Sequence, residues 1–231
     1  MVRNGVITGA SRGIGRETAV TLAKDKWHLV LQGRNLEALT DTCSMVEKAG
    51  GKATPVVADL SGDEGTAALV NGINSVPLHL LVNNAGVAHV KPFEETTREE
   101  WDETLAVNVT APFLLTKKLY RVMAEGSCIV NILSVAARVG FANWSSYCMS
   151  KFALDGLMRS VREELRPRGI RVINIYPGAT STGMWESIPG DWPRGKMLPP
   201  AEVARAVRYA IERPGDVLVE DIFLGNISGT L

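Results

Sequence analysis

The amino-acid sequence predicts an α/β fold, a doubly wound parallel sheet of about seven strands with helices on both faces. Short apolar runs rich in β-branched residues recur along the 231 residues, and amphipathic helical patterns separate them. Strands that alternate with helices require crossover connections, and right-handed crossovers place helices on both faces of the sheet. Each run is apolar enough to predict a buried strand. The expected strands are 5–8, 28–32, 53–58, 79–82, 127–133, 171–176 and 216–224.

The best-defined helix is expected at 147–166, where four apolar residues recur at a spacing of four and charged residues lie elsewhere. This spacing places the apolar residues on one face of an amphipathic helix. Pro167 and Gly169 follow the pattern and end it, as expected for residues that interrupt a helix. A second long helix is expected at 99–123, and a last one begins near Pro200.

The composition argues against several classes of function. Lys and Arg together number 25, as do Asp and Glu, so zero net charge creates no overall field for nucleic acid or an acidic membrane. The three cysteines form no CxxC pair, which argues against both a disulfide framework and a zinc site. The first residues of the sequence lack the apolar core of a signal peptide, and no apolar run reaches about 18 residues. We expect one cytoplasmic domain, 1–231, with no metal, nucleic-acid or membrane partner.

A glycine-rich loop follows the first expected strand and reads Thr8-Gly-Ala-Ser-Arg-Gly-Ile-Gly15. Glycines let the backbone turn tightly and approach a pyrophosphate, which free amides at a helix start stabilise. A tight turn without a ligand is the simpler interpretation. The strand before the loop, and the helix and strand after it, favour dinucleotide binding. The residues expected to contact the dinucleotide here are Gly9, Ser11, Arg12, Gly13, Ile14 and Gly15.

The TGxxxGxG spacing resembles the short-chain dehydrogenase/reductase family, whose members have a Rossmann-type fold. The sequence is similar to 3-oxoacyl-carrier-protein reductases and related carbonyl reductases. Further family motifs follow in the expected order between residue 5 and about residue 184. They are Asp59-Leu60, Asn83-Asn84-Ala85-Gly86, Asn108, Ser134, Tyr147 with Lys151 as YxxxK, and Pro177-Gly178.

Carbonyl reduction by hydride transfer needs a proton donor for the oxygen. Tyrosine, with an ordinary pKa of about 10, also needs a nearby cation if it is to act as a base near neutrality. Lys151 lies four residues after Tyr147, on the same face of the expected helix. The resemblance implies that Tyr147 is the general acid or base and that Lys151 lowers its pKa and binds the nicotinamide ribose. It also implies that Ser134 holds the substrate oxygen and Asn108 anchors a water in a proton relay.

The resemblance also implies a set of cofactor contacts beyond the glycine loop. An Asp near the adenine ring, the NNAG segment and the strand end at Pro177 belong to this set. Backbone groups near Thr180 and the hydroxyl of Thr182 would hold the nicotinamide carboxamide. These expected cofactor-binding residues are Asp59, Leu60, Asn83, Ala85, Gly86, Tyr147, Lys151, Pro177, Gly178, Thr180 and Thr182.

The residue after the second strand distinguishes NADP from NAD, because a carboxylate there would repel the 2′-phosphate of NADP. The sequence reads Gln32-Gly33-Arg34-Asn35, with no acid. Arg34 is available for charge-assisted hydrogen bonds to a phosphate, and Arg12 is a second candidate. Both arginines are also compatible with an ordinary surface position. NADP(H) is therefore expected in preference to NAD(H).

Two segments are candidates for substrate recognition, 136–146 and a lid at about 182–199. Three of the five tryptophans fall within them, where they either pack the lid onto the domain or contact the substrate. The segments favour an apolar or aromatic carbonyl compound or the corresponding alcohol, and an acyl thioester is a further candidate. The expected substrate contacts are Ser134, Phe141, Trp144, Tyr147, Met184 and Trp185.

Five arginines cluster near the end of the 147–166 helix. A solvated face shared with Glu163 and Glu164 is the favoured interpretation, and docking of an acidic acyl-carrier partner is the alternative. The family resemblance also implies a homodimer or homotetramer. A non-catalytic NADP-binding sensor or scaffold of the same fold is the alternative to an enzyme, although such relatives usually lose the Tyr or Lys that this chain keeps. The clustered arginines are Arg159, Arg162, Arg166, Arg168 and Arg171.

Overall fold

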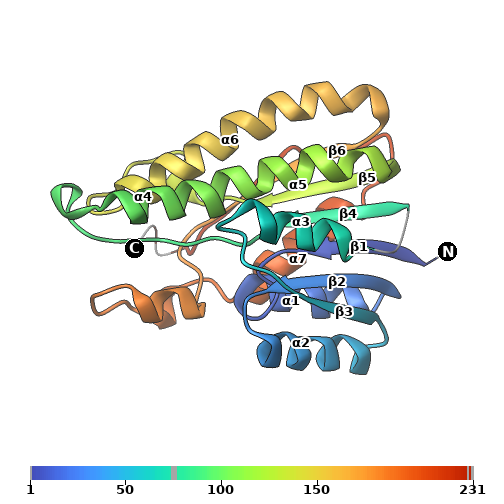
Figure 1. Ribbon diagram of the computed structural model, residues 1–231, viewed down its shortest axis with the longest axis horizontal. Helices are drawn as coiled ribbons and strands as arrows, with labels where there is room; N and C mark the ends of the chain where they lie inside the picture. The colour runs from blue at the N-terminus through green and yellow to red at the C-terminus, as the bar shows by residue number, and fades with distance from the viewer. Residues whose placement is uncertain (1, 74–76, 228, 230–231) are drawn as a thin grey trace.

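The computed structural model describes residues 2–73, 77–227 and 229, so both ends of the expected domain 1–231 lie outside the described residues. Seven strands form one parallel sheet in the order β3-β2-β1-β4-β5-β6-β7 (Figure 1). The chain builds outward from β1 to β3 and then crosses back to β4, which creates a topological switch point beside β1. The strands are β1 (Arg3–Ile7), β2 (Trp27–Gly33), β3 (Lys52–Val57), β4 (Leu78–Asn83), β5 (Met123–Ile132), β6 (Arg171–Pro177) and β7 (Asp221–Leu224).

All seven expected strands are present, and the differences concern their ends and their burial. β5 begins at Met123, earlier than expected, because an irregularity in its pairing with β4 lets Met123 pair with Leu78. β7 is confined to four residues. The expectation that every strand is buried is wrong for β3 and β7, the two edges of the sheet. Neither strand has a fully buried residue, because an edge strand has a neighbour on one side only.

Helices α1 (Gly13–Ala23), α2 (Leu36–Lys48) and α7 (Pro200–Ile211) cover one face of the sheet, as Figure 1 shows. Their apolar residues pack against Ile7 and Leu31 and their neighbours in one buried cluster. Alternate residues of the same strands point to the opposite face, as the strand period of two requires.

The opposite face is covered by α3 (Asp63–Asn71), α4 (Arg98–Leu105), α5 (Ala111–Leu119) and α6 (Ser145–Leu165) (Figure 1). The helix expected at 99–123 is interrupted between α4 and α5 by a π-helical turn, Ala106–Thr110, and ends in a 3-10 turn, Tyr120–Val122. The apolar periodicity of the sequence continues through such a turn and therefore does not predict the wider π-helical coil. π-Helical turns are frequent at functional sites, and this one contains Asn108.

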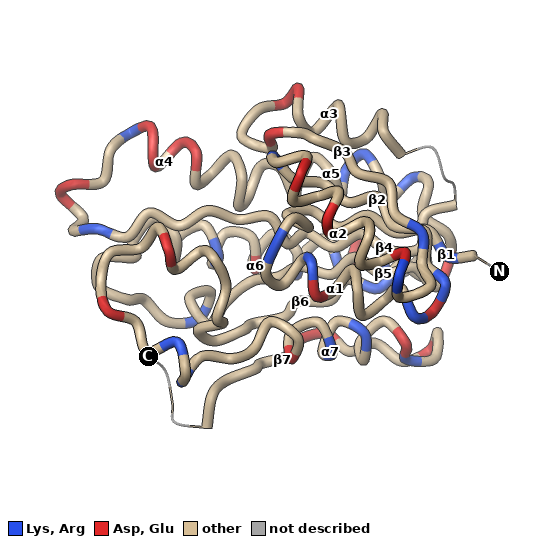
Figure 2. The backbone as a smooth tube through the Cα atoms, turned by 90° about the horizontal axis from the view of Figure 1, so that it is seen from below, with Lys and Arg blue, Asp and Glu red and all other residues tan. Residues whose placement is uncertain are grey.

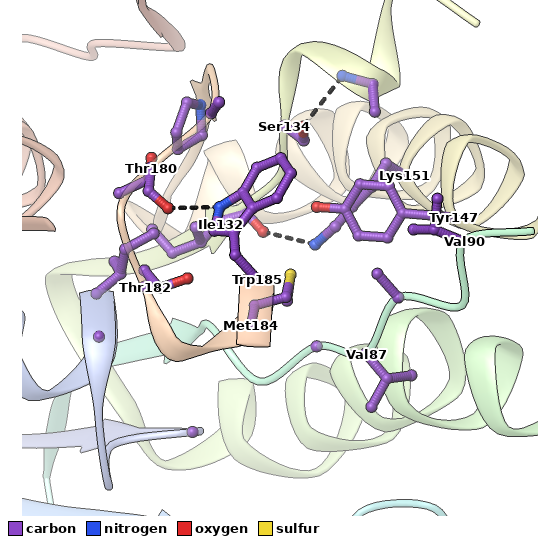
Figure 3. A pocket seen from close by; sticks show the side chains of 18 of the residues that line it. Val87, Val90, Ile132, Ser134, Tyr147, Lys151, Thr180, Thr182, Met184 and Trp185 are labelled. Carbon is purple, nitrogen blue, oxygen red and sulfur yellow. Dashed lines mark hydrogen bonds between the residues drawn. The ribbon is translucent and has the colours of Figure 1, made fainter. Parts of the chain in front are cut away.

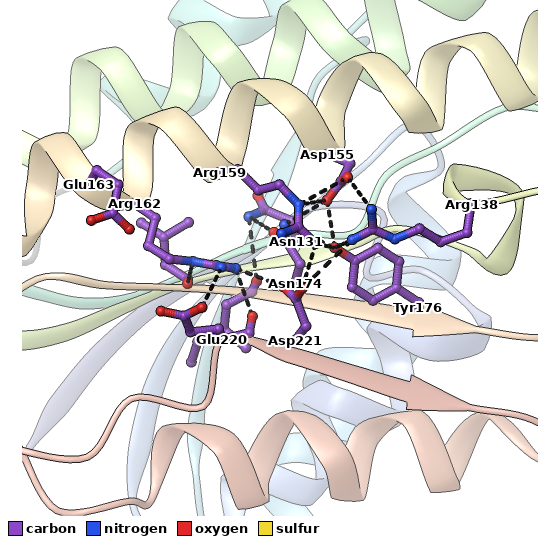
Figure 4. Close-up of polar contacts among 12 residues, drawn as sticks. Asn131, Arg138, Asp155, Arg159, Arg162, Glu163, Asn174, Tyr176, Glu220 and Asp221 are labelled. Atoms are coloured by element: carbon purple, nitrogen blue, oxygen red, sulfur yellow. Dashed lines mark hydrogen bonds and ion pairs between the residues drawn. The ribbon is translucent and has the colours of Figure 1, made fainter.

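The expectation of a solvated arginine face at the end of α6 holds for Arg166 and Arg168 but is wrong for Arg162 and Arg171. Only 3% of the Arg162 side chain is exposed, and its guanidinium lies 2.9 Å from the carboxylate of Asp221 on β7. Arg159 pairs with Asp155 at 2.9 Å. Arg171 is buried as well and donates hydrogen bonds to main-chain carbonyls. Figure 4 shows the guanidinium groups of Arg159 and Arg162 turned toward the sheet and engaged there.

The remaining two arginines of the cluster are also engaged. Arg166 pairs with Glu163 at 2.8 Å, and the guanidinium of Arg168 lies 5.0 Å from the centre of the Tyr120 ring. The alternative interpretation, a cationic surface for an acidic acyl carrier, keeps only Arg166 and Arg168 as exposed members of the cluster.

The surface carries charges of both signs. Figure 2 shows Lys and Arg interspersed with Asp and Glu over most of the chain, with Asp and Glu predominating along α4. Among the described residues, no helix is long and apolar enough to cross a membrane, and no group of three potential metal ligands is present. Cys43, Cys128 and Cys148 are buried free thiols.

Candidate active site

A cavity of about 990 Å³ lies at the carboxyl ends of the central strands. Ligands bind at this edge in open α/β sheets. The glycine loop after β1, the ends of β2, β4, β5 and β6, the start of α6 and the segment after β6 line the cavity. Its volume is at the upper end of the usual range for small-molecule sites, about 300 to 1,000 Å³.

The glycine loop has the conformation that its glycines permit. Gly9 and Gly13 have φ values of +63° and +57°, in the left-handed region that side chains disfavour. A Cβ at Gly15 would lie only 2.4 Å from the carbonyl oxygen of Gly9, so Gly15 lets α1 start directly against the loop. No side chain caps the start of α1 at Arg12. Its first amides are therefore available to an anion.

Neighbouring strands hold the glycine loop through polar contacts. The Asn84 side-chain amide donates to the carbonyls of Thr8 and Gly9 at 2.8 and 3.1 Å. The Thr8 hydroxyl accepts from the backbone amides of Asn84 and Ala85. Gln32 accepts from the Gly9 amide at 2.9 Å and donates to the Ala58 carbonyl. These contacts fix the loop to the ends of β2 and β4 without a ligand.

Asn83, expected among the cofactor contacts, is not among the residues that line the cavity. Asn83 is buried, and its side chain donates to Asn131 on β5 at 2.9 Å. Adjacent residues of a strand point to opposite faces, and Asn84, its neighbour, reaches the loop and the cavity. Gly15 likewise supports the loop and is not among the lining residues.

The adenosine end of the cavity is open and polar. Arg34 and Arg12 line it, with about 62% and 63% of their side chains exposed. Their nearest carboxylates, on Glu103 and Glu186, are 4.0 and 3.9 Å away. Ion pairs this long and exposed contribute little, so both guanidinium groups are available for a phosphate.

Asp59 and Leu60 line the same end of the cavity. The backbone amide of Ser61 donates to the Asp59 carboxylate at 2.9 Å. This hydrogen bond lowers the pKa of Asp59 and holds its side chain at the end of β3.

Ser134, Tyr147 and Lys151 converge on the opposite end of the cavity. Ser134 follows β5 and its hydroxyl accepts from the Ala136 amide at 3.1 Å. Tyr147 and Lys151 lie on one face of α6, and the Lys151 ammonium donates to the Ile132 carbonyl at 2.9 Å. Figure 3 shows the Tyr147 hydroxyl directed into the cavity toward Trp185, with the Lys151 ammonium nearby.

Burial dominates the protonation of Tyr147 and Lys151. It raises the pKa of Tyr147 to about 12, although a hydrogen bond with Ser134 opposes the shift. Burial also lowers the pKa of Lys151 to about 8. In the protein by itself, removal of both groups from water therefore outweighs the expected lowering of the Tyr147 pKa by Lys151. At neutral pH Tyr147 carries its proton.

Asn108 lies behind the cavity wall and is not among the lining residues. Its side chain accepts from the Val87 amide and donates to the Val87 carbonyl, both at 2.9 Å. It also donates to the Ser150 hydroxyl at 2.9 Å. These contacts connect the π-helical turn, the segment after β4 and α6, so Asn108 positions the wall next to Tyr147 and Lys151.

The expected substrate residues surround the end of the cavity that holds Tyr147. Phe141 and Trp144 precede α6, and Met184 and Trp185 lie in the lid after β6. The expected lid, 182–199, forms two short 3-10 turns, Gly183–Ser187 and Arg194–Lys196. Thr180 and Thr182 lie where β6 leads into the lid, and they line the cavity together with Pro177 and Gly178.

The comparison with known proteins agrees with this arrangement. A model of the short chain dehydrogenase family matches residues 3–191. The chain belongs to the short-chain dehydrogenase family. It is therefore an oxidoreductase with the Rossmann-type fold expected from the sequence. Sepiapterin reductase of Chlorobaculum tepidum is 33% identical to it, with 98% of this chain and 97% of that protein covered. L-Xylulose reductase of Mesocricetus auratus is 35% identical, with 85% and 79% covered.

Solved structures of other short-chain dehydrogenases are similar over almost the whole chain. The alcohol dehydrogenase of the archaeon Thermococcus sibiricus, complexed with 5-hydroxy-NADP, has a TM-score of 0.88 and 28% identity, with 98% of this chain and 97% of that chain covered. The landomycin C-6 ketoreductase LanV, with bound NADP and rabelomycin, has a TM-score of 0.87 and 30% identity, with the same shares covered.

Several residues that line the cavity of this short-chain dehydrogenase are not predicted from the sequence. The segment after β4 lines the cavity. Trp192, which belongs to the expected substrate segment, joins Trp144 and Trp185 there. Gln32, Asn84 and Ile132 also contribute. For Asn84 the signal is present, because it stands within the NNAG motif. For the segment after β4, only the fold brings it to the site. Its lining residues are Val87, Ala88, His89, Val90 and Lys91.

Proposed function

We propose that this short-chain dehydrogenase interconverts a small-molecule carbonyl compound and a secondary alcohol with NADP(H), and that Tyr147 is its general acid or base. The observation that carries the proposal is the meeting of Ser134, Tyr147 and Lys151 in the same cavity as the glycine loop. A nucleotide-binding protein without turnover needs the loop alone. The combination supports an enzyme over the alternative of a sensor or scaffold.

NADP(H) is the cofactor, as its presence in structures of several similar chains supports. The residues of this chain fit it. Left-handed glycines let the backbone approach a pyrophosphate, and the uncapped start of α1 stabilises its charge. Arg34 and Arg12 are free to bind the 2′-phosphate. When bound, the reduced cofactor supplies the hydride.

The protein's own residues supply the proton and the orientation. Tyr147 is protonated at neutral pH, since burial raises its pKa, and is therefore prepared to donate a proton to a carbonyl oxygen as negative charge develops there. Ser134 holds that oxygen through its hydroxyl. Lys151 carries a buried amine beside Tyr147 and is positioned by the Ile132 carbonyl. This protonation state supports reduction as the direction of the reaction at neutral pH.

The test compares Tyr147→Phe with the parent in NADPH oxidation, over a panel of ketones, aldehydes, quinones and 3-oxoacyl thioesters. We expect loss of the proton donor to lower kcat by about 100-fold to 10,000-fold, with the affinity for NADPH unchanged. Tyr209→Phe, at an exposed tyrosine of α7 outside the cavity, is the matched control. Full activity of Tyr147→Phe would overturn the assignment of the proton donor. NADPH binding without turnover of any carbonyl by the parent would favour the sensor or scaffold.

We also propose that the enzyme acts in the cytoplasm as a homodimer or homotetramer, in agreement with the family resemblance. Sedimentation of the purified chain tests the assembly.

A further inference from the structure

We propose that the substrates of this enzyme are carbonyl compounds with a flat aryl ring next to the carbonyl carbon. The proposal rests on the proposed function, because it concerns the substrate end of the same cavity. Three tryptophans carry it, Trp144, Trp185 and Trp192, here called the tryptophan wall. All three line the cavity together with Tyr147.

The wall extends directly from Tyr147. The ring centre of Trp144 lies 5.5 Å from that of Tyr147 with an angle of 67° between the planes. Trp185 and Trp192 also contact Trp144, with ring centres 5.7 and 6.3 Å from its own. Trp185 and Trp192 are 4.8 Å apart. The wall thus joins the start of α6 to the lid and places indole rings beside the proposed proton donor.

Hydrogen bonds from the indole N–H groups, which lie in the ring planes, fix the orientation of two of the rings. The indole N–H of Trp185 donates to the Thr180 carbonyl at 2.8 Å, and that of Trp192 donates to the Pro189 carbonyl at 3.2 Å. Each bond satisfies the polar atom of the ring. All three tryptophans are partly exposed, so part of each ring remains open to contact. Figure 3 shows Trp185 and Met184 facing Tyr147 across the cavity.

The other residues at this end favour an uncharged, flat group. Phe141, Val90 and Met184 line the same region, and a thioether makes favourable contacts with aromatic rings. On the facing segment, the Lys91 ammonium is paired with Glu100 at 2.7 Å, and the His89 ring lies 2.9 Å from the Glu103 carboxylate.

An aromatic pair stabilises a complex by more than its buried area alone contributes. The additional free energy corresponds to about a twofold to tenfold change in affinity. A flat aryl ring can make such contacts with the wall. A puckered saturated ring of the same size cannot make them.

The test measures binding separately from turnover. Acetophenone and cyclohexyl methyl ketone differ only in whether the ring is aromatic, and calorimetry gives the affinity of each for Tyr147→Phe saturated with NADP⁺. We expect acetophenone to bind about tenfold more tightly. Trp192→Leu and Trp185→Leu, each combined with Tyr147→Phe, should reduce this ratio by about threefold to tenfold. Trp101→Leu, at a tryptophan of α4 outside the cavity, should leave it unchanged.

The outcomes of these measurements distinguish the aryl substrate class from the proposed carbonyl reduction. Equal affinities for the two ketones, or binding of neither, would overturn the aryl substrate class, and so would a ratio that survives both tryptophan changes. Turnover of cyclohexyl methyl ketone as efficiently as acetophenone by the parent would count against the aryl class and leave carbonyl reduction intact. A preserved aryl preference in binding, without turnover of any carbonyl, would support the wall as an aryl site and contradict the proposed function.

Discussion

The guanidinium of Arg138 lies 3.0 Å from the carboxylate of Asp155, and this contact ties the turn after Ser134 to the helix that carries Tyr147 and Lys151. Arg138 also donates to the Tyr176 hydroxyl at 2.9 Å. Figure 4 shows these side chains meeting between α6 and the sheet. The network therefore controls how Ser134 lies relative to Tyr147.

Arg138→Met should disturb that relationship without unfolding the protein. Asp155 is buried and keeps Arg159 as a partner at 2.9 Å, so we expect a loss of about 1 to 2 kcal/mol in the free energy of unfolding. A displaced Ser134 should lower kcat by about tenfold or more and leave the affinity for NADPH unchanged. Urea unfolding and steady-state kinetics measure the two effects.

The control for Arg138→Met is Arg166→Met, which breaks an exposed pair with Glu163. This change should cost at most about 1 kcal/mol and leave kcat at the parent value. An Arg138→Met enzyme with unchanged kcat and reduced stability would show that the network supports the fold alone.

Gly15→Ala should weaken NADPH binding. The added Cβ would meet the Gly9 carbonyl oxygen at 2.4 Å, so the loop must move away from the start of α1, at a cost of about 1 to 3 kcal/mol. We expect about a tenfold rise in the Kd for NADPH by fluorescence titration. Gly156→Ala in α6 is the matched control, since no atom lies within 4 Å of its Cβ. It should raise stability by about 0.5 to 1 kcal/mol and leave the Kd unchanged, and equal effects of the two changes would refute the steric argument.

Arg34→Asp should shift cofactor preference. A guanidinium that binds the 2′-phosphate contributes a charge-assisted hydrogen bond, and its loss should weaken NADPH by about tenfold to a hundredfold. NADH lacks that phosphate and should bind with little change. Arg205→Asp, at an exposed arginine of α7 that pairs with Glu202, controls for the change in net charge. Equal weakening of NADPH and NADH by Arg34→Asp would show that another residue, with Arg12 the first candidate, reads the phosphate.

The sequence predicts the local parts of this site well. The glycine loop, Ser134 and the pair of Tyr147 and Lys151 lie at the cavity as expected, because each depends on spacing within one strand end or one helix. Asn83, expected at the cavity, lies away from it, because the choice between two adjacent strand residues depends on the face of the sheet to which each points. Here Asn131, on the neighbouring strand, takes up the Asn83 side chain.

Contacts between residues distant in the sequence explain two further differences between the expected and the observed structure. Arg162 reads as a surface residue of an amphipathic helix, yet Asp221, 59 residues further along the chain, draws it inward. The tryptophan wall combines residues from two segments, and nothing in either segment alone shows that their rings meet.

The π-helical turn at Ala106–Thr110 keeps the apolar periodicity of the flanking helices, so periodicity cannot reveal it.

At neutral pH and without cofactor, Lys151 should lower the free energy of unfolding. Burial lowers its pKa from 10.5 to about 8, so the unfolded state binds more protons between these values and the free energy of unfolding rises with pH there. The shift corresponds to about 3 kcal/mol. Two raised pKa values act in the opposite direction, that of Cys128, about 11 against 9, and that of Tyr147, about 12 against 10, because the folded state then retains the extra proton. The increase should therefore be clearest between about pH 8 and about pH 9.

Lys151→Met removes the buried amine and tests this effect. The variant loses the hydrogen bond to the Ile132 carbonyl, worth about 1 kcal/mol. We therefore expect it to be about 1 to 2 kcal/mol more stable than the parent near pH 7, with the difference shrinking as the pH rises toward 10. Lys118→Met, at an exposed lysine of α5, should leave stability unchanged throughout. Urea unfolding at both ends of the pH range is the measurement. A Lys151→Met protein less stable than the parent at neutral pH would mean that the folded protein stabilises the ammonium, and that contacts outweigh its burial.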